Sequence, residues 1–207
     1  LMEAKHISTL DIKCLVLRYP DTTCQEHHKM DYLEEMRFLI DHPQRMKFVT
    51  NLALSLKGNT LVLFQFVQRH GEILFTTRKA AAESGRHVFF VFGNTPTEER
   101  EAIRHIVEQE ENAIIVASYG TFSTGINIKR LHNVIFSSPS KSVIRVLQSI
   151  GRGLRRTDDK ESMTLYDVVD DLRHGKKMNF TLKHFMARVE IYNTEKFSYK
   201  LFPIDLP

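Results

Sequence analysis

The sequence has little cysteine and no long apolar run, and both absences narrow what the chain can be. Cys14 and Cys24 are the two cysteines in 207 residues, and their spacing fits no metal-ligand motif. Cys14 lies in an apolar run, so we expect a buried free thiol and a reducing, cytoplasmic location. No run of about 18 apolar residues and no signal peptide occurs, so we expect no contact with a membrane.

Two motifs of nucleotide-binding proteins are also absent. The phosphate-binding pattern G-x-x-x-x-G-K-[ST] does not occur, and residues 174–177 (HGKK) have the wrong leading spacing and no hydroxyl. The dipeptide Asp-Glu does not occur either, so the chain has no acidic box of the kind that holds Mg²⁺. The sequence begins at Leu1 and not at Met, so we expect a fragment of a longer protein.

The charge balance is mildly basic. The chain has 29 Lys and Arg against 25 Asp and Glu, a net charge of +4. This charge permits a nucleic-acid partner but does not require one. The composition is 42% hydrophobic and 26% charged, which is typical of a globular domain.

Short apolar runs alternate with helical patterns along most of the chain. Strands are predicted at residues 10–17, 60–67, 87–92, 113–118, 133–136, 162–169 and 197–206. Helices are predicted at residues 31–40, 43–56, 70–83, 96–109, 140–150 and 181–195, with a polar loop at residues 21–29. Apolar runs without alternation are typical of strands that are covered on both faces. The predicted fold is therefore α/β, an open, mostly parallel sheet flanked by helices, with a C-terminal helix and an edge strand.

Local signals refine two of these elements. Residues 95–98 (TPTE) predict a capping box with proline at the first helical position. Pro203 confines the last strand to a sheet edge or a strand end, because proline cannot donate to a neighbouring strand.

The most informative motif is residues 148–156 (QSIGRGLRR), which has the pattern Q-x-x-G-R-x-x-R. Arg152 and Arg155 are three residues apart, beside glycines that let backbone and phosphate approach closely. Guanidinium groups present a planar fork of donors, and two of them can clamp the charge that develops in phosphoryl transfer. From the spacing alone, a surface charge cluster without function is an equal alternative.

Other candidate segments support a site because they follow predicted strands. Residues 65–69, 93–94 and 118–125 all lie where a strand ends. Ligands of open α/β sheets bind at the carboxyl ends of the strands, so these segments are expected to meet there.

The segments TLVLFQFV, AIIVASYGTFSTGIN and VLQSIGRGLRR resemble, in order and separation, motifs IV, V and VI of superfamily-two helicases. These motifs belong to the second RecA-like domain of such motors, and the resemblance covers residues 60–171. Residues 117–126 and both ends of the chain also resemble recombination and repair helicases of T-even-type phages.

The resemblance implies roles at the nucleotide. Arg155 corresponds to the arginine finger and Arg152 to a phosphate anchor, both reaching ATP that is bound on the first RecA-like domain. The other implied ATP contacts are Gln148, Gly125, Asn127 and Gly151. Asn127 stands where many relatives carry Asp, which leaves its ribose contact open.

The resemblance also implies contacts to the nucleic-acid backbone, which position the strand without reading its sequence. The implied residues are Ser118, Tyr119, Thr121, Gln65, Arg69 and His70. The alternative for Ser118 and Thr121 is that their side chains only cap a turn and do not contact nucleic acid. The basic residues after the sheet either follow DNA phosphates or form a solvated helix face: Lys176, Lys177, Lys183 and Arg188. The acidic residues Asp167, Asp170 and Asp171 are expected to be a strand end and a helix cap, not a paired acidic site.

Three parts follow from the resemblance. Residues 1–42 form an N-terminal strand and helical lead-in from the interdomain linker, residues 43–172 the second RecA-like domain, and residues 173–207 a C-terminal helix–strand extension. ATP and Mg²⁺ are expected to bind mainly to a first RecA-like domain that this chain lacks, so the chain alone is expected to be inactive. The complete protein would be a monomeric ATP-dependent DNA helicase or translocase in the host cytoplasm. It would remodel single-stranded or branched DNA in recombination and repair.

Two alternatives remain open. The motor half of a restriction enzyme or of an RNA translocase shares motifs IV to VI, although the phage-like ends argue against it. A non-enzymatic nucleic-acid-binding module would use Arg152 and Arg155 for DNA affinity instead of catalysis.

Overall fold

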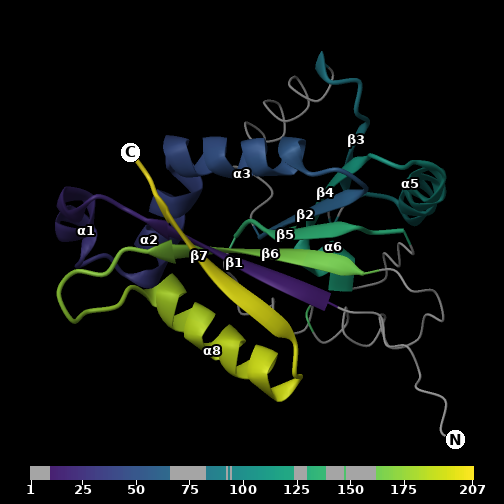
Figure 1. The fold of residues 1–207 in the computed structure, drawn as a ribbon. Helices are drawn as coiled ribbons and strands as arrows, with labels where there is room; N and C mark the ends of the chain where they lie inside the picture. The colour runs from purple at the N-terminus through teal and green to yellow at the C-terminus, as the bar shows by residue number, and fades with distance from the viewer. Residues whose placement is uncertain are drawn as a thin grey trace, which may run out of the picture.

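The centre of the molecule is a seven-stranded sheet with strand order β3-β4-β2-β5-β6-β1-β7 (Figure 1). The structure, a computed structural model, describes residues 10–65, 83–91, 93, 95–123, 130–138, 147 and 162–207. Every strand pairing is parallel. The strands are β1 Leu10–Arg18, β2 Thr60–Phe64, β3 Val88–Val91, β4 Ile114–Ser118, β5 Asn133–Phe136, β6 Met163–Asp171 and β7 Ser198–Asp205. The expected open parallel α/β sheet is confirmed.

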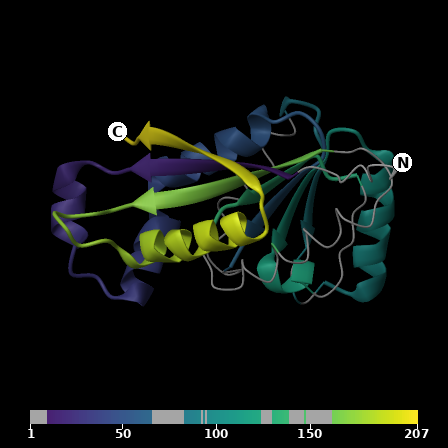
Figure 2. The same cartoon turned by 60° about the horizontal axis from the view of Figure 1, so that its bottom comes forward.

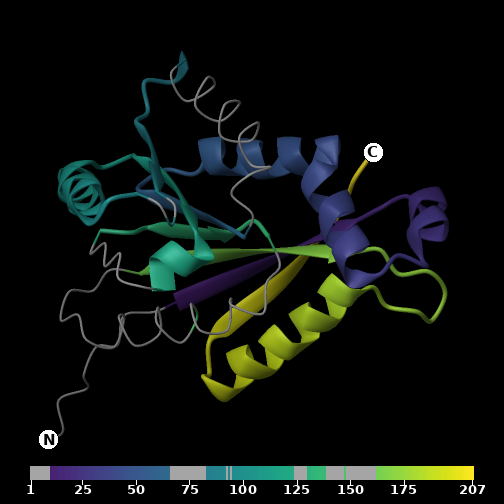
Figure 3. The ribbon, with the colours of Figure 1, turned by 180° about the vertical axis from the view of Figure 1, so that it is seen from behind.

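Helices cover both faces of the sheet (Figures 2 and 3). One face packs against α5 (Thr97–Gln109), α6 (Tyr119–Ser123) and α8 (Phe180–Thr194). The other face packs against α1 (Asp21–His27), α2 (Tyr32–Asp41) and α3 (Pro43–Ser55). Among the described residues, no helix is both long and apolar enough to cross a membrane.

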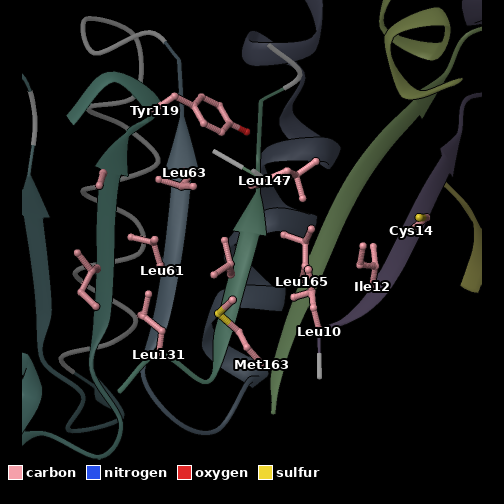
Figure 4. Close-up of a cluster of buried hydrophobic side chains, with 14 of the residues drawn as sticks. Leu10, Ile12, Cys14, Leu61, Leu63, Tyr119, Leu131, Leu147, Met163 and Leu165 are labelled. Carbon is pink, nitrogen blue, oxygen red and sulfur yellow. The ribbon is translucent and has the colours of Figure 1, made fainter. Parts of the chain in front are cut away.

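The two helical layers explain why the central strands lack alternation. Strands β2, β4 and β5 are buried at every position, whereas the edge strand β7 is mostly exposed. Figure 4 shows one of the two apolar layers, in which Ile12, Leu61, Leu63 and Leu165 are fully buried. Each such side chain contributes about 1.5–3 kcal/mol by leaving water, so the middle of the sheet is the most stably packed part.

The helix starts follow local sequence where a cap is available. Asp31 caps α2 through a reciprocal capping box with Glu34, and Pro43 opens α3. The box predicted at residues 95–98 is wrong. Pro96, which has extended backbone, is itself the N-cap of α5, and no side chain caps the helix there.

The polar loop predicted at residues 21–29 is also wrong, because residues 21–27 form α1. Cys24 supplies the reason, since it is buried against the apolar cluster under α2 and α3 and so gives the short helix a core contact. Of the helix predicted at residues 140–150, the structure describes only Leu147, which is helical and fully buried. The helix predicted at residues 70–83 lies outside the described residues except for its last residue.

The C-terminal strand confirms the edge position that proline requires. β7 is the last strand in the order and pairs with β1, so Pro203 faces Val16 on one side and no described strand on the other. The C-terminal segment therefore returns to the same sheet that contains the first strand.

Candidate nucleic-acid interface

The described part of the predicted site lies at the carboxyl edge of the sheet. It comprises Gln65, Ser118, Tyr119 and Thr121. The remaining predicted site residues lie outside the described residues: Arg69, His70, Gly125, Asn127, Gln148, Gly151, Arg152 and Arg155.

Parallel pairing brings three strand ends together. Phe64 at the end of β2 is level with Ser118 at the end of β4. Gln65, the residue after Phe64, therefore lies at the same edge as Ser118. On the other side of β2, Leu63 is level with Phe136, which Ser137 follows. Segments that are more than 50 residues apart in sequence thus meet at one edge, as expected for an open α/β sheet.

Ser118 caps the short helix that follows β4. The hydroxyl groups of Ser118 and Thr121 lie 2.6 Å apart, and the Thr121 backbone N–H donates to Ser118 Oγ at 3.3 Å. Both side chains are buried, with exposed fractions of 8% and 3%. Burial limits what can reach these two hydroxyls, which are already bonded to each other.

Tyr119 ties the end of β4 to the end of β5. Its hydroxyl donates to the Ser138 carbonyl at 2.7 Å, and its ring meets Phe136 edge-on at 5.9 Å. The side chain is buried, and burial raises the pKa of its phenol well above the ordinary value. In Figure 4 Tyr119 lies at the strand ends, above the apolar layer. In this structure Tyr119 therefore braces the edge.

Gln65 leaves an acceptor open at the same edge. Its Oε1 is buried and has no hydrogen-bond partner in the described part of the chain. A buried carbonyl without a partner costs about 1–3 kcal/mol. Such an atom is a natural acceptor for a donor from a ligand or from a segment outside the described ranges.

A buried ion pair between α3 and β6 supports this edge of the sheet. Arg45 of α3 binds Asp170 of β6 through Nε and Nη2, at 2.8 and 3.0 Å. Its Nη2 also donates to the Ser137 carbonyl at 2.7 Å, and the Tyr19 hydroxyl donates to Asp170 Oδ1 at 2.8 Å. We call Tyr19, Arg45 and Asp170 the Asp170 cluster. It joins α3 and β6 to the end of β5.

The opposite face of β6 carries a second cluster. Arg188 of α8 binds both oxygens of Asp167 at 2.9 Å, and the Tyr192 hydroxyl donates to Asp167 at 2.6 Å. We call Asp167, Arg188 and Tyr192 the Asp167 cluster. Arg188 Nη1 is buried and has no partner among the described residues.

Both clusters correct the sequence analysis. Arg188 is 2% exposed, so it neither follows DNA phosphates nor lies on a solvated helix face. Asp170 and Asp171 are the last two residues of β6, which confirms the expected strand end. Asp167 lies inside the strand, the N-cap of α8 is Asn179 instead of an aspartate, and both Asp167 and Asp170 bind a buried arginine. Helical spacing could have predicted that both arginines are buried, because residues four apart lie on the same face of a helix. Arg188 lies four residues before the buried Tyr192, and Arg45 lies four residues before the buried Val49.

The described residues do not fit a Mg²⁺ site. Asp167 and Asp170 already bind guanidinium groups, and no group of three His, Cys, Asp or Glu in this part of the chain could hold a metal. Ligands for Mg²⁺ would have to come from elsewhere.

The parallel sheet, its polar carboxyl edge and the helicase-like motifs define a class, the RecA-like motor domains. Residues 44–157 match the family of helicase conserved C-terminal domains, and the chain belongs to this family. This confirms the resemblance to superfamily-two helicases.

Two curated relatives extend the comparison. The chain is 35% identical over 219 residues to the ATP-dependent DNA helicase uvsW of Enterobacteria phage T4, covering 100% of this chain and 43% of the relative. It is 26% identical over 193 residues to the putative ATP-dependent RNA helicase L396 of Acanthamoeba polyphaga mimivirus, covering 86% of this chain and 35% of that relative. The chain thus spans less than half the length of these relatives.

Two solved structures are similar to this chain as well. The crystal structure of T4 UvsW matches with a TM-score of 0.82 and 34% identity, covering 97% of this chain and 42% of that one. The C-terminal domain of the DEAD-box protein Dbp5 matches with a TM-score of 0.55 and 12% identity, covering 96% of this chain and 91% of that one. The second match shows the fold alone.

Proposed function

We propose that this chain is the second RecA-like domain of an ATP-dependent DNA helicase or translocase that remodels branched DNA in recombination and repair. The similarity to T4 UvsW carries the proposal, because it covers the whole chain in sequence and nearly all of it in structure. The carboxyl edge, where Gln65 and Ser118 meet, gives a place for the nucleic-acid backbone.

Within this proposal, Arg155 is the arginine finger and Arg152 the phosphate anchor. The family match spans residues 44–157 and therefore includes both arginines as well as Gln148 and Gly151. Gly125 and Asn127 are the further nucleotide contacts. An arginine finger stabilises the charge that develops in phosphoryl transfer and is worth roughly 10³–10⁵ in rate.

The nucleic-acid contacts proposed at the edge are Gln65, Arg69, His70, Ser118, Tyr119 and Thr121. The buried Gln65 acceptor, which has no partner among the described residues, supports a further polar contact at this edge. Tyr119 would act by holding the strand ends in place, because its hydroxyl is already bonded to Ser138. ATP and Mg²⁺ would be held mainly by a first RecA-like domain, so this chain by itself would be inactive. We also propose the division at residues 42 and 172, a monomer and a location in the host cytoplasm.

DNA-stimulated ATP hydrolysis by the full-length protein tests the proposal. Arg155→Ala is expected to lower turnover by roughly 10³-fold or more, with near-normal DNA affinity. Arg156→Ala is the matched control, because Arg156 lies next to the finger but outside the Q-x-x-G-R-x-x-R pattern. Lost DNA binding with unchanged turnover per bound complex would instead favour the non-enzymatic binding module.

A second candidate substrate is RNA, because one relative is named a putative RNA helicase. Stimulation of ATP hydrolysis by matched DNA and RNA strands separates the two substrates. Stronger stimulation by RNA would overturn the DNA assignment and leave the motor assignment intact.

A further inference from the structure

The end of the molecule beyond β6 carries a basic and aromatic surface that the motifs do not account for. We call it the β6–α8 tip: residues 173–183, together with Tyr32 of α2. Figures 1 and 2 show the loop between β6 and α8 beside α1, at one end of the sheet. The Lys177 ammonium donates to the His28 carbonyl at 2.7 Å, and the His28 and His174 rings lie 5.0 Å apart, so loop and α1 are in contact.

Positive charge is concentrated in this segment. Residues 173–189 contain no Asp or Glu and five basic side chains: Arg173, Lys176, Lys177, Lys183 and Arg188. Arg188 is buried with Asp167, and Arg173 pairs with Asp171 at 2.6 Å. Three lysines remain uncompensated within the segment, although the whole chain has a net charge of only +4.

The acidic groups next to the tip are occupied in helix caps. Glu35 is buried and accepts from the Phe180 and Thr181 backbone N–H groups, so it already caps α8. Asp31 and Glu34 cap α2 reciprocally. The start of α8 is therefore not itself an anion site, and the lysines provide the attraction.

An exposed aromatic ring lies among the lysines. Phe180 is 38% exposed, and the Lys183 ammonium lies 5.6 Å from the centre of its ring. The Tyr32 ring packs edge-on against the Phe180 ring, with 6.1 Å between the ring centres, and this contact helps to fix the Phe180 side chain. A ring beside ammonium groups is the arrangement on which proteins stack unpaired bases while cations follow the backbone.

The tip continues the edge that contains the candidate interface. Its loop leaves the carboxyl end of β6, three places from β4 in the strand order, so both features lie on the same edge of a parallel sheet. Asp167 is level with the last residue of β5, and β6 runs on to Asp171, so the tip projects beyond β5. A strand that lies along the edge would reach it.

We propose that the β6–α8 tip binds single-stranded nucleic acid, with one base on Phe180 and backbone phosphates at Lys176 and Lys183. This proposal rests on the proposed function and adds a second contact beyond the helicase motifs. Phe180 and Lys183 also line a hollow beside α1, whose lining includes the Glu35 carboxylate, so we place the phosphates on the outer surface and not in this hollow.

Binding of a fluorescently labelled oligothymidylate to the full-length protein tests the ring. Phe180→Ala is expected to weaken affinity by about 5- to 100-fold, the usual effect of removing a stacking platform. Phe202→Ala is the matched control, because Phe202 is 39% exposed but lies on the edge strand β7. On a duplex of equal length Phe180→Ala should have little effect, because the base faces are already stacked.

The lysines are tested by salt dependence. Replacing Lys176 and Lys183 together by alanine should lower the slope of log affinity against log salt by about 1.4, since each phosphate contact on a single strand contributes about 0.7. Replacing Lys47 and Lys200, exposed lysines on α3 and β7, removes the same charge elsewhere and should leave the slope unchanged. An oligouridylate measured in parallel separates DNA from RNA.

Two failures can be told apart. If wild type binds and the tip variants match their controls, the tip is not a nucleic-acid contact, and its apolar residues would serve a protein partner instead. If wild type binds no strand and shows no nucleic-acid-stimulated ATP hydrolysis, the proposed function fails as well.

Discussion

The two faces of β6 carry the same three side-chain types in different surroundings. The Asp170 cluster and the Asp167 cluster each contain an aspartate bound by an arginine through two nitrogens and by a tyrosine hydroxyl. In the first, the arginine also binds the Ser137 carbonyl at the end of β5. In the second, Arg188 Nη1 is buried without a partner among the described residues.

The difference shows that similar buried ion pairs can have different structural roles. Desolvation offsets much of the attraction between buried charges, so neither pair is evidence of high stability by itself. The Asp170 cluster additionally positions a strand end beside the candidate interface. The Asp167 cluster fastens α8 to the middle of β6 and leaves one donor unsatisfied, which costs about 1–3 kcal/mol.

Removing one carboxylate should produce the largest effect in both clusters. Asp167→Ala and Asp170→Ala each leave a buried guanidinium without its partner, so the free energy of unfolding should fall by about 3–5 kcal/mol in equilibrium urea unfolding. Asp171→Ala is the control, because its partner Arg173 is 56% exposed and water replaces the lost contact. A loss below about 1 kcal/mol at either buried aspartate would contradict the described pairing.

Replacing whole pairs should separate the two clusters. Asp167→Leu with Arg188→Met and Tyr192→Phe removes the unsatisfied donor together with every group that bonds to Asp167, and should change the free energy of unfolding by about 1 kcal/mol or less. Asp170→Leu with Arg45→Met and Tyr19→Phe also leaves the Ser137 carbonyl unpaired and should cost about 1–3 kcal/mol more. Equal losses from the two triple variants, measured in the same urea series, would show that the Ser137 contact adds nothing.

Alkaline pH should affect the Asp167 side more. Cys14 is level with Asp167, and burial, with the Asp167 charge, raises the pKa of its thiol from 9.0 to about 12. The unfolded chain ionises first, so stability is present below pH 9 and is lost by about 1.4 kcal/mol per pH unit between pH 9 and about 12. Cys14→Ala should remove this contribution and leave that of the buried tyrosines Tyr19, Tyr119 and Tyr192, whose pKa values burial also raises.

Cys24 offers the matched comparison on the other side, since its Sγ donates to the Tyr19 carbonyl at 3.6 Å. Burial raises the pKa of Cys24 as well. The urea midpoint should fall less steeply between pH 8 and 11 in Cys14→Ala than in Cys24→Ala. A less steep fall in Cys24→Ala would contradict the expectation that Cys14 contributes more to the loss of stability at alkaline pH.

The smallest effect is expected at an ion pair outside both clusters. Arg18 and Asp205 bond at 2.8 Å, but their side chains are 51% and 76% exposed. Asp205→Asn should lower the free energy of unfolding by about 0.5 kcal/mol or less, and less still at high salt. A loss comparable to that of Asp170→Ala would mean that burial does not explain the difference between buried and surface pairs.

Prediction from sequence succeeded where the signal is local. The apolar runs predicted every described strand, and the signal is clearest for β2, β4 and β5, because burial on both faces gives a pattern that can be read within five residues. It was wrong for α1 and for the cap of α5, where a single buried Cys24 and the geometry of Pro96 decided the outcome. The roles of Arg152 and Arg155 stay predictions, since both lie outside the described residues.

The alternation of strands and helices, the helicase motifs and the edge position of the last strand can all be read from the amino-acid sequence. These depend on side-chain periodicity and on the missing N–H of Pro203, which neighbouring residues reveal. The folded chain was needed to show that Arg45 binds Asp170, 125 residues away, that Arg188 is buried, and that Gln65 and Ser118 lie at one edge of the sheet. Such contacts depend on which elements pack together, and no local pattern specifies the partner of a buried charge.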